Sequence, residues 1–189
     1  MRNLLRSSFF GDRGHVWPVL LLGAVILFFG CHREPPLNPG IATFKQELKS
    51  CLGSLSTNLE EPVARKDIAG ITAALANVES PTVKLCRLCP FEIGVLDPAG
   101  KILATYPVKG AGKAKDFSSY DLVKKAISGK KIQQQGLFLP DGSKLYLVCA
   151  PLIRKDVLIG LVAIAISSED AKKRWSLTEK EFLALDFNT

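Results

Sequence analysis

Histidine is scarce in this sequence, which contains only His15 and His32 among 189 residues. A Ser-His-Asp triad in the chain after the leader would have to use His32, and no Gly-x-Ser-x-Gly elbow is present. Residues 110–115 look like a phosphate-binding loop, but they lack the first glycine at the required spacing and a Ser or Thr after the lysine. We therefore expect neither an enzyme nor a bound cofactor.

Long tracts of biased composition are also missing, which argues against a disordered, collagen-like or coiled-coil protein. With 47% hydrophobic residues, the chain can bury one core of ordinary size. The formal net charge is +7, but Arg2, Arg6 and Arg13 lie in a leader-like segment, so the remaining basic excess is mild. We therefore expect no nucleic-acid partner.

The first 30 residues have the pattern of a signal peptide. Three arginines precede an uncharged apolar run over residues 16–30, which as a helix would reach roughly 22 Å against a hydrocarbon core of ~30 Å. Residues 27–31 resemble a bacterial lipoprotein cleavage box, although Phe28 and Phe29 depart from it, and this implies acylation of Cys31, for example by palmitate. The alternative is a retained, slightly short membrane anchor. Either way the domain would be tethered outside the cytoplasm.

Two helices are predicted after a proline-containing spacer at residues 31–40. Apolar residues recur every three or four positions from Ile41 to Leu59, which predicts a helical face about five turns long. Pro62 is expected to end this helix. A second helix is predicted over residues 68–78, with Asp67 as its N-cap or first-turn acid.

From residue 91 the apolar spacing changes from helical to strand-like. Two runs separated by the turn Asp97–Gly100 predict a hairpin, and a capping box at Ser118–Asp121 predicts a helix that stops at Gly129. Three further strands joined by short turns predict an antiparallel meander. The five predicted strands are 91–96, 101–106, 132–139, 145–153 and 157–166.

The last predicted strand is apolar on both faces, so it should lie at the centre of the sheet under helical cover. Residues 168–189 are charged and are predicted to form a C-terminal tail with one short helix, signalled by Ser176–Glu179. The predicted fold class is therefore α+β: a five-stranded antiparallel sheet with a long N-terminal helix and a helical cover.

This order of elements resembles the Cache family of extracytoplasmic PAS-like sensor domains over residues 41–167. The segments that carry the resemblance are 91–105 (FEIGVLDPAGKILAT), 116–129 (DFSSYDLVKKAISG) and the closing pair of strands. The resemblance implies that the domain binds a small carboxylate, amine or amino acid between the sheet and its helix-and-loop cover. Such domains usually sit between two membrane helices of a chemoreceptor, kinase or cyclase. This sequence has one leader and no output module, so we expect signalling through a separate membrane protein.

The same resemblance places the pocket at the second strand, the loop and helix start over residues 109–120, and the third and fourth strands. Six side chains there are candidates for holding a ligand: Tyr106, Phe117, Tyr120, Asp121, Phe138 and Tyr146. Aromatic walls supply apolar contact area, and hydroxyl or carboxylate groups fix the ligand's orientation. Each candidate also has a structural interpretation, with the phenylalanines as core and Asp121 as a capping acid.

The motif Cys86-Arg-Leu-Cys89 has the spacing of a redox pair, of half a zinc site or of a haem attachment site. Pro90 stands where haem attachment requires histidine. With Cys51 and Cys149, the pair could form two disulfides in any of three pairings, or a zinc site that lacks a second closely spaced pair, and we predict no metal site. Besides a sensor, the sequence therefore leaves open a thiol–disulfide protein and a scaffold without a ligand.

Overall fold

Five strands form one antiparallel sheet in the spatial order β2-β1-β5-β4-β3. The computed structural model describes residues 38–77, 91–107 and 116–189. The predicted leader, the Cys86–Cys89 pair and the loop at 109–115 therefore lie outside the described residues. The strands are β1 (Phe91–Leu96), β2 (Ile102–Tyr106), β3 (Gln133–Phe138), β4 (Lys144–Arg154) and β5 (Val157–Ser167). The predicted meander and the central place of the last strand are confirmed.

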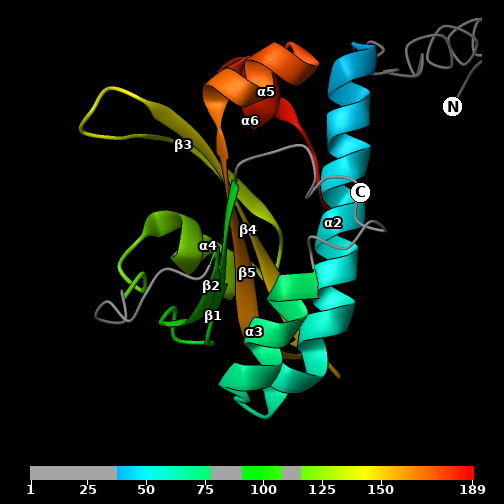
Figure 1. Ribbon diagram of the computed structural model, residues 1–189, viewed down its shortest axis with the longest axis vertical. Helices are drawn as coiled ribbons and strands as arrows, with labels where there is room; N and C mark the ends of the chain where they lie inside the picture. The colour runs from blue at the N-terminus through cyan, green and yellow to red at the C-terminus, as the bar shows by residue number, and fades with distance from the viewer. Residues whose placement is uncertain (1–37, 78–90, 108–115) are drawn as a thin grey trace, which may run out of the picture. The chain divides into compact units, whose positions relative to one another are not determined.

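Helices cover both faces of this sheet (Figure 1). The described helices are α2 (Pro39–Ala64), α3 (Ile68–Ala76), α4 (Asp121–Gly129), α5 (Ser168–Trp175) and α6 (Glu179–Ala184). One face packs against α2 and α3, with α5 and α6 at one end, and is called the α2 face below. The opposite face packs against α4 and is called the α4 face. The predicted α+β fold class is confirmed.

The core lies mainly on the α2 face, where long aliphatic side chains of the strands meet the apolar stripe of α2. The central strands contribute buried residues at alternate positions, as expected for one face of a pleated sheet. They are Ile93, Val95, Val148, Val162 and Ile164, and each is no more than 1% exposed. Burial of this kind stabilises a domain by about 25 cal/mol per Å² of apolar surface.

Tight turns connect the strands as the sequence predicts. Asp97 accepts hydrogen bonds from the N–H groups of Ala99 and Lys101, both at 2.9 Å, which closes the β1–β2 hairpin. Gly100 has φ +85° there, and a Cβ at this position would lie 2.9 Å from the Cα of Ser118, so glycine is required. Lys155 and Asp156 both have positive φ, the pattern of a type I′ turn between β4 and β5.

The structure corrects the predicted helix boundaries at two places. Pro62 does not end the first helix, because it lies in the last turn of α2, which continues to Ala64. A proline in a last turn leaves only one carbonyl without its partner. The predicted capping box at Ser118–Asp121 is also wrong: Tyr120 is the N-cap of α4 and makes no capping bond through its side chain.

The C-terminal residues 168–189 are part of the core rather than a peripheral tail. Trp175, Leu177, Phe182, Leu185 and Phe187 are all buried on the α2 face. The region contains two helices, and the capping box of α6 pairs Thr178 with Glu181, two residues after the predicted signal. The edge strand β3 is tied to this region by Gln134, whose side-chain amide donates to the carbonyls of Phe182 and Leu185. Removing this segment would therefore expose one end of the core.

Candidate ligand-binding face of the sheet

The α4 face has small side chains at the middle of the sheet. The strand register aligns five residues in one row across it: Thr105, Gly94, Ala163, Cys149 and Gln133. The next row holds Glu92, Ala165, Leu147 and Gln135. The small residues Gly94, Ala163 and Ala165 therefore stand on β1 and β5, and the polar residues Thr105, Gln133 and Gln135 stand on the edge strands β2 and β3.

These small residues are only partly covered by the described part of the chain. Gly94, Ala163 and Ala165 are each half-buried, whereas their neighbours on the α2 face are fully buried. A Cβ added to Gly94 meets no described atom within 4 Å. A sheet surface of glycine and alanine with polar groups beside it leaves room for a small molecule, which needs apolar contact and a few orienting hydrogen bonds.

Helix α4 covers the other end of this face. Its residues Leu122, Val123 and Ala126 are buried in one cluster with Leu96 and Leu161 of the sheet. The chain enters the helix beside the β1–β2 turn, where the Phe117 N–H donates to the carbonyl of Gly100 at 3.0 Å. This arrangement leaves the small-residue rows next to the start of α4.

An aspartate stabilises the backbone just before this helix. The backbone of Asp116 forms an isolated antiparallel β-bridge with Lys101, and its carboxylate accepts a hydrogen bond from the Ser118 N–H at 2.8 Å. The pKa of Asp116 is lowered, first by its hydrogen bond from the Ser118 side chain and then by that backbone bond. The carboxylate therefore stays charged at neutral pH and keeps this turn closed.

Three of the six predicted ligand residues lie at the start of α4. Phe117 and Tyr120 contact each other with ring centroids 5.1 Å apart. Tyr120 is 46% exposed, and Asp121, the first helical residue, is also exposed. Phe117 packs against the apolar cluster under α4. These three residues border the α4 face, and the structure brings them together.

Two further predicted ligand residues, Tyr106 and Tyr146, pack on the α2 face. Tyr146 is 3% exposed and stacks on Phe182, with ring centroids 4.5 Å apart and planes inclined by 10°. Its pKa is raised, mainly by burial and further by Glu179 and Glu181. Tyr106 pairs with Ile93 in the register and packs against the same core. In the structure Tyr146 therefore has a packing role.

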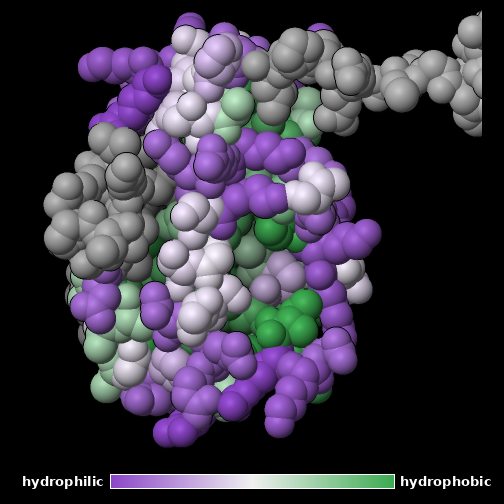
Figure 2. Space-filling view, turned by 90° about the vertical axis from the view of Figure 1, so that its right-hand side faces the viewer, coloured by the Kyte–Doolittle hydropathy of each residue, from purple (hydrophilic) through white to green (hydrophobic). Residues whose placement is uncertain are grey.

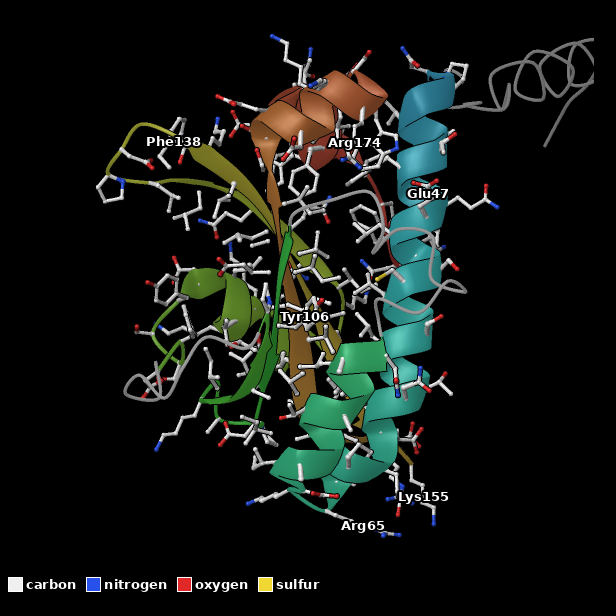
Figure 3. The ribbon with its side chains drawn as sticks, viewed as in Figure 1. Glu47, Arg65, Tyr106, Phe138, Lys155 and Arg174 are labelled. Carbon is white, nitrogen blue, oxygen red and sulfur yellow. The ribbon has the colours of Figure 1, made fainter. Side chains whose placement is uncertain are left out.

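Phe138 lies apart from both groups at the outer end of the β3–β4 hairpin, whereas Tyr106 lies by the middle of the sheet (Figure 3). Its ring is 69% exposed, and the Lys144 ammonium stands 3.9 Å from the ring centroid. The six candidates thus do not line one pocket. Side chains alternate between faces along a strand, so the register decides which residues share a surface.

Sequence reasoning missed the residues that line the open part of the α4 face. Thr105 lies next to Tyr106 in sequence but on the opposite face of the sheet. A glycine inside the run FEIGVL and the alternation Ala163-Ile164-Ala165 were visible signals, because small residues in a strand often mark a close approach.

The four candidate cysteines do not all fall within the described structure. Cys51 is buried on the α2 face and Cys149 on the α4 face, in separate clusters. Burial raises the pKa of Cys149 to about 12, which keeps this free thiol protonated and unreactive at neutral pH. The sheet thus separates these two cysteines, and this argues against a zinc site that would use both as ligands.

Within the described ranges, no helix combines the length and apolar character needed to cross a bilayer.

Comparisons with known proteins identify the fold. No family model and no curated protein matches the sequence. A domain described as part of a sensory box/GGDEF family protein from Vibrio parahaemolyticus matches with a TM-score of 0.57 at 15% identity, over 75% of this chain and 60% of that one. The ligand-binding domain of a Pseudomonas fluorescens chemoreceptor, in complex with L-isoleucine, matches with a TM-score of 0.53 at 11% identity, over 71% and 55%.

A Campylobacter jejuni chemoreceptor domain in complex with 4-methylisoleucine also matches, with a TM-score of 0.53 at 14% identity, over 79% of this chain and 69% of that one. These neighbours are sensory and ligand-binding domains rather than enzymes. The chain therefore has the Cache-like sensor-domain fold that its sequence resembles. The match spans about 60% of the Vibrio domain, and at these identities the likeness establishes the fold alone.

Proposed function

We propose that this protein is an extracytoplasmic, membrane-anchored sensor domain that binds a small organic molecule on the α4 face of its sheet. The observation that carries the proposal is the pair of rows at Gly94 and Ala165, where small residues leave the central strands partly uncovered beside α4. The neighbouring folds of chemoreceptors and kinases support a sensory role. The domain itself would carry out no catalysis.

The proposed ligand is a small carboxylate, amine or amino acid. Solved neighbours hold L-isoleucine and 4-methylisoleucine, which are compact molecules with one apolar side chain. On this chain Gly94 and Ala163 would accept an apolar group, and Thr105, beside Gly94 in the same row, would bond to a polar atom. Phe117, Tyr120 and Asp121 would close the site from α4.

The anchor and the output are part of the same proposal. Acylation of Cys31, or retention of the apolar run before it, would hold the domain at a bilayer. Signals would then pass to a separate membrane protein that contacts the domain. Radiolabelled palmitate incorporation by the wild-type chain, and its loss in Cys31→Ser, would test the acylated form of the anchor.

A thermal-shift screen of the full chain in mild nonionic detergent tests ligand binding. The compounds are amino acids, small carboxylates and amines. A ligand at a hundredfold excess over its Kd adds about 2.7 kcal/mol of stability, which raises Tm by roughly 5–10 °C for a domain of this size. Gly94→Leu fills the open space and should abolish the shift.

The matched control is Gly129→Leu, since an added Cβ at Gly129 also meets nothing within 4 Å and the residue lies at the far end of α4 from Phe117. This variant should keep the shift produced by the same ligand. A broad screen without stabilisation, or a screen in which every shift survives Gly94→Leu unchanged, would overturn the proposed site.

A further inference from the structure

A hollow lies at the edge of β4, where Ala150 and Pro151 have no partner on β3, between α2 and the residues that follow α4. Its volume is about 300 Å³, at the lower end of the range of small-molecule sites (~300–1,000 Å³). Its apolar lining includes Leu52 of α2, Pro151 of β4 and Phe187 near the C-terminus. Figure 2 looks onto the side of the domain that carries α2 and shows apolar areas set among polar side chains.

Of the described residues, three lysines and no aspartate or glutamate line this hollow. The Lys49 ammonium donates to the backbone oxygen of Thr189, and the Lys130 ammonium donates to the backbone oxygen of Asp156 at 2.8 Å. Within the described ranges, neither these two nor Lys131 is paired with an acidic side chain. Lys130 and Lys131 therefore bring positive charge to the hollow beside an apolar surface, without an acidic side chain paired to either among the described residues.

The backbone around the lysines is held in place by the C-terminal segment. The Asn188 side chain accepts a hydrogen bond from the Ile132 N–H at 2.8 Å and donates one to the Ile132 carbonyl at 3.2 Å. Lys130 ends α4 with φ +47°, a conformation in which a lysine costs stability relative to glycine. The fixed turn directs the chain so that Lys130 and Lys131 both line the hollow next to Phe187.

We propose that this hollow is a second ligand site, which binds a small organic monocarboxylate with an apolar body. The apolar body would lie against Leu52 and Phe187, and the carboxylate would face Lys130 and Lys131. Positive charge without acidic neighbours selects an anion, and apolar contact supplies affinity that inorganic anions lack. The hollow lies at the edge of β4, between α2 and the end of α4, and none of its described lining residues belongs to the rows at Gly94 and Ala165, so the two sites are distinct.

The test measures binding of phenylacetate to the full chain in nonionic detergent by isothermal titration calorimetry. Phenylacetamide, which has the same shape without the charge, is the matched probe. We expect saturable binding of phenylacetate that weakens as salt is raised, and at least tenfold weaker binding of phenylacetamide. Lys131→Ala should weaken phenylacetate binding about threefold or more, while Lys131→Arg retains it.

Glycine variants separate the two sites. Gly53 also lines the hollow, so Gly53→Trp should abolish phenylacetate binding, whereas Gly53→Ala and Gly94→Leu should leave it intact. Equal binding of the neutral amide, or binding that persists in both Gly53→Trp and Lys131→Ala, would refute this second site. Binding that is lost in Gly94→Leu alone would also refute it and would assign phenylacetate to the α4 face.

Discussion

Truncating Phe182 tests directly whether the C-terminal segment completes the core. Its ring is fully buried, stacks on Tyr146 at 4.5 Å and meets the ring of Phe44 edge-on at 6.5 Å. Phe182→Ala removes the ring from a site that cannot collapse easily, because α2, β4 and α6 surround it. Such substitutions cost about 3–5 kcal/mol, which includes ~0.5–1.5 kcal/mol for each lost aromatic pair.

The assay is equilibrium urea unfolding, in which the midpoint should fall while the m-value stays constant. A cost of this size is a large share of the 5–15 kcal/mol typical of a domain. Leu183→Ala is the matched control, since Leu183 is the next residue of the same helix and is 48% exposed. We expect it to change stability by less than about 1 kcal/mol.

A loss of less than about 1 kcal/mol in Phe182→Ala, or equal losses in both variants, would refute the placement of this helix on α2 and β4. It would also show that residues 168–189 behave as the peripheral tail that the charge pattern suggests.

Two further variants probe local features. Cys149→Ala removes a thiol whose pKa is raised by burial from its ordinary value of 9.0 to about 12. Because the thiol loses its proton at lower pH in the unfolded chain, the free energy of unfolding of the wild type should fall by about 1.4 kcal/mol per pH unit between pH 9 and 12. Thermal melts of the variant should show a smaller loss of stability over this range. Identical pH profiles for the two proteins would contradict the buried thiol. Thr178→Ala breaks the capping box with Glu181 and should cost about 1 kcal/mol at pH 7 by urea unfolding, while Thr178→Ser retains it. The lowered pKa of Glu181 comes first from the Thr178 hydroxyl, so the part of the stabilisation that needs the Glu181 carboxylate is present at neutral pH and is lost as pH falls through the folded pKa. The Thr178 hydroxyl still accepts from the Glu181 N–H in acid, so a Thr178→Ala penalty of unchanged size in acid would contradict this cause.

The elements of this fold were predictable because their signals are local. The turn Asp97–Gly100 closes through bonds between neighbouring residues, and Asp67 caps α3 by accepting from the Gly70 N–H three positions away. The apolar run of β5 predicted a central strand, since only a strand covered on both faces tolerates it. Such features depend on a few adjacent residues, which the sequence displays directly.

The candidate site was less predictable because it depends on register. Choosing Tyr106 instead of Thr105, or Tyr146 instead of Leu147, moves a predicted ligand contact to the other face of the sheet. The sequence shows that these residues are neighbours, but the face that meets α2 is set by the pairing of β1 with β5, between residues about 65–75 positions apart.

The sequence alone determined the α+β class, the strand runs and the leader pattern, because periodicity and turn chemistry act over a few residues. Tertiary structure alone decided that residues 168–189 join the core, that Tyr146 packs on Phe182, and that Gly94 and Ala165 share an open face. These outcomes require contacts between segments far apart in the chain. The free energy gained when two surfaces bury each other depends on both segments, so it cannot be read from the sequence of either segment alone.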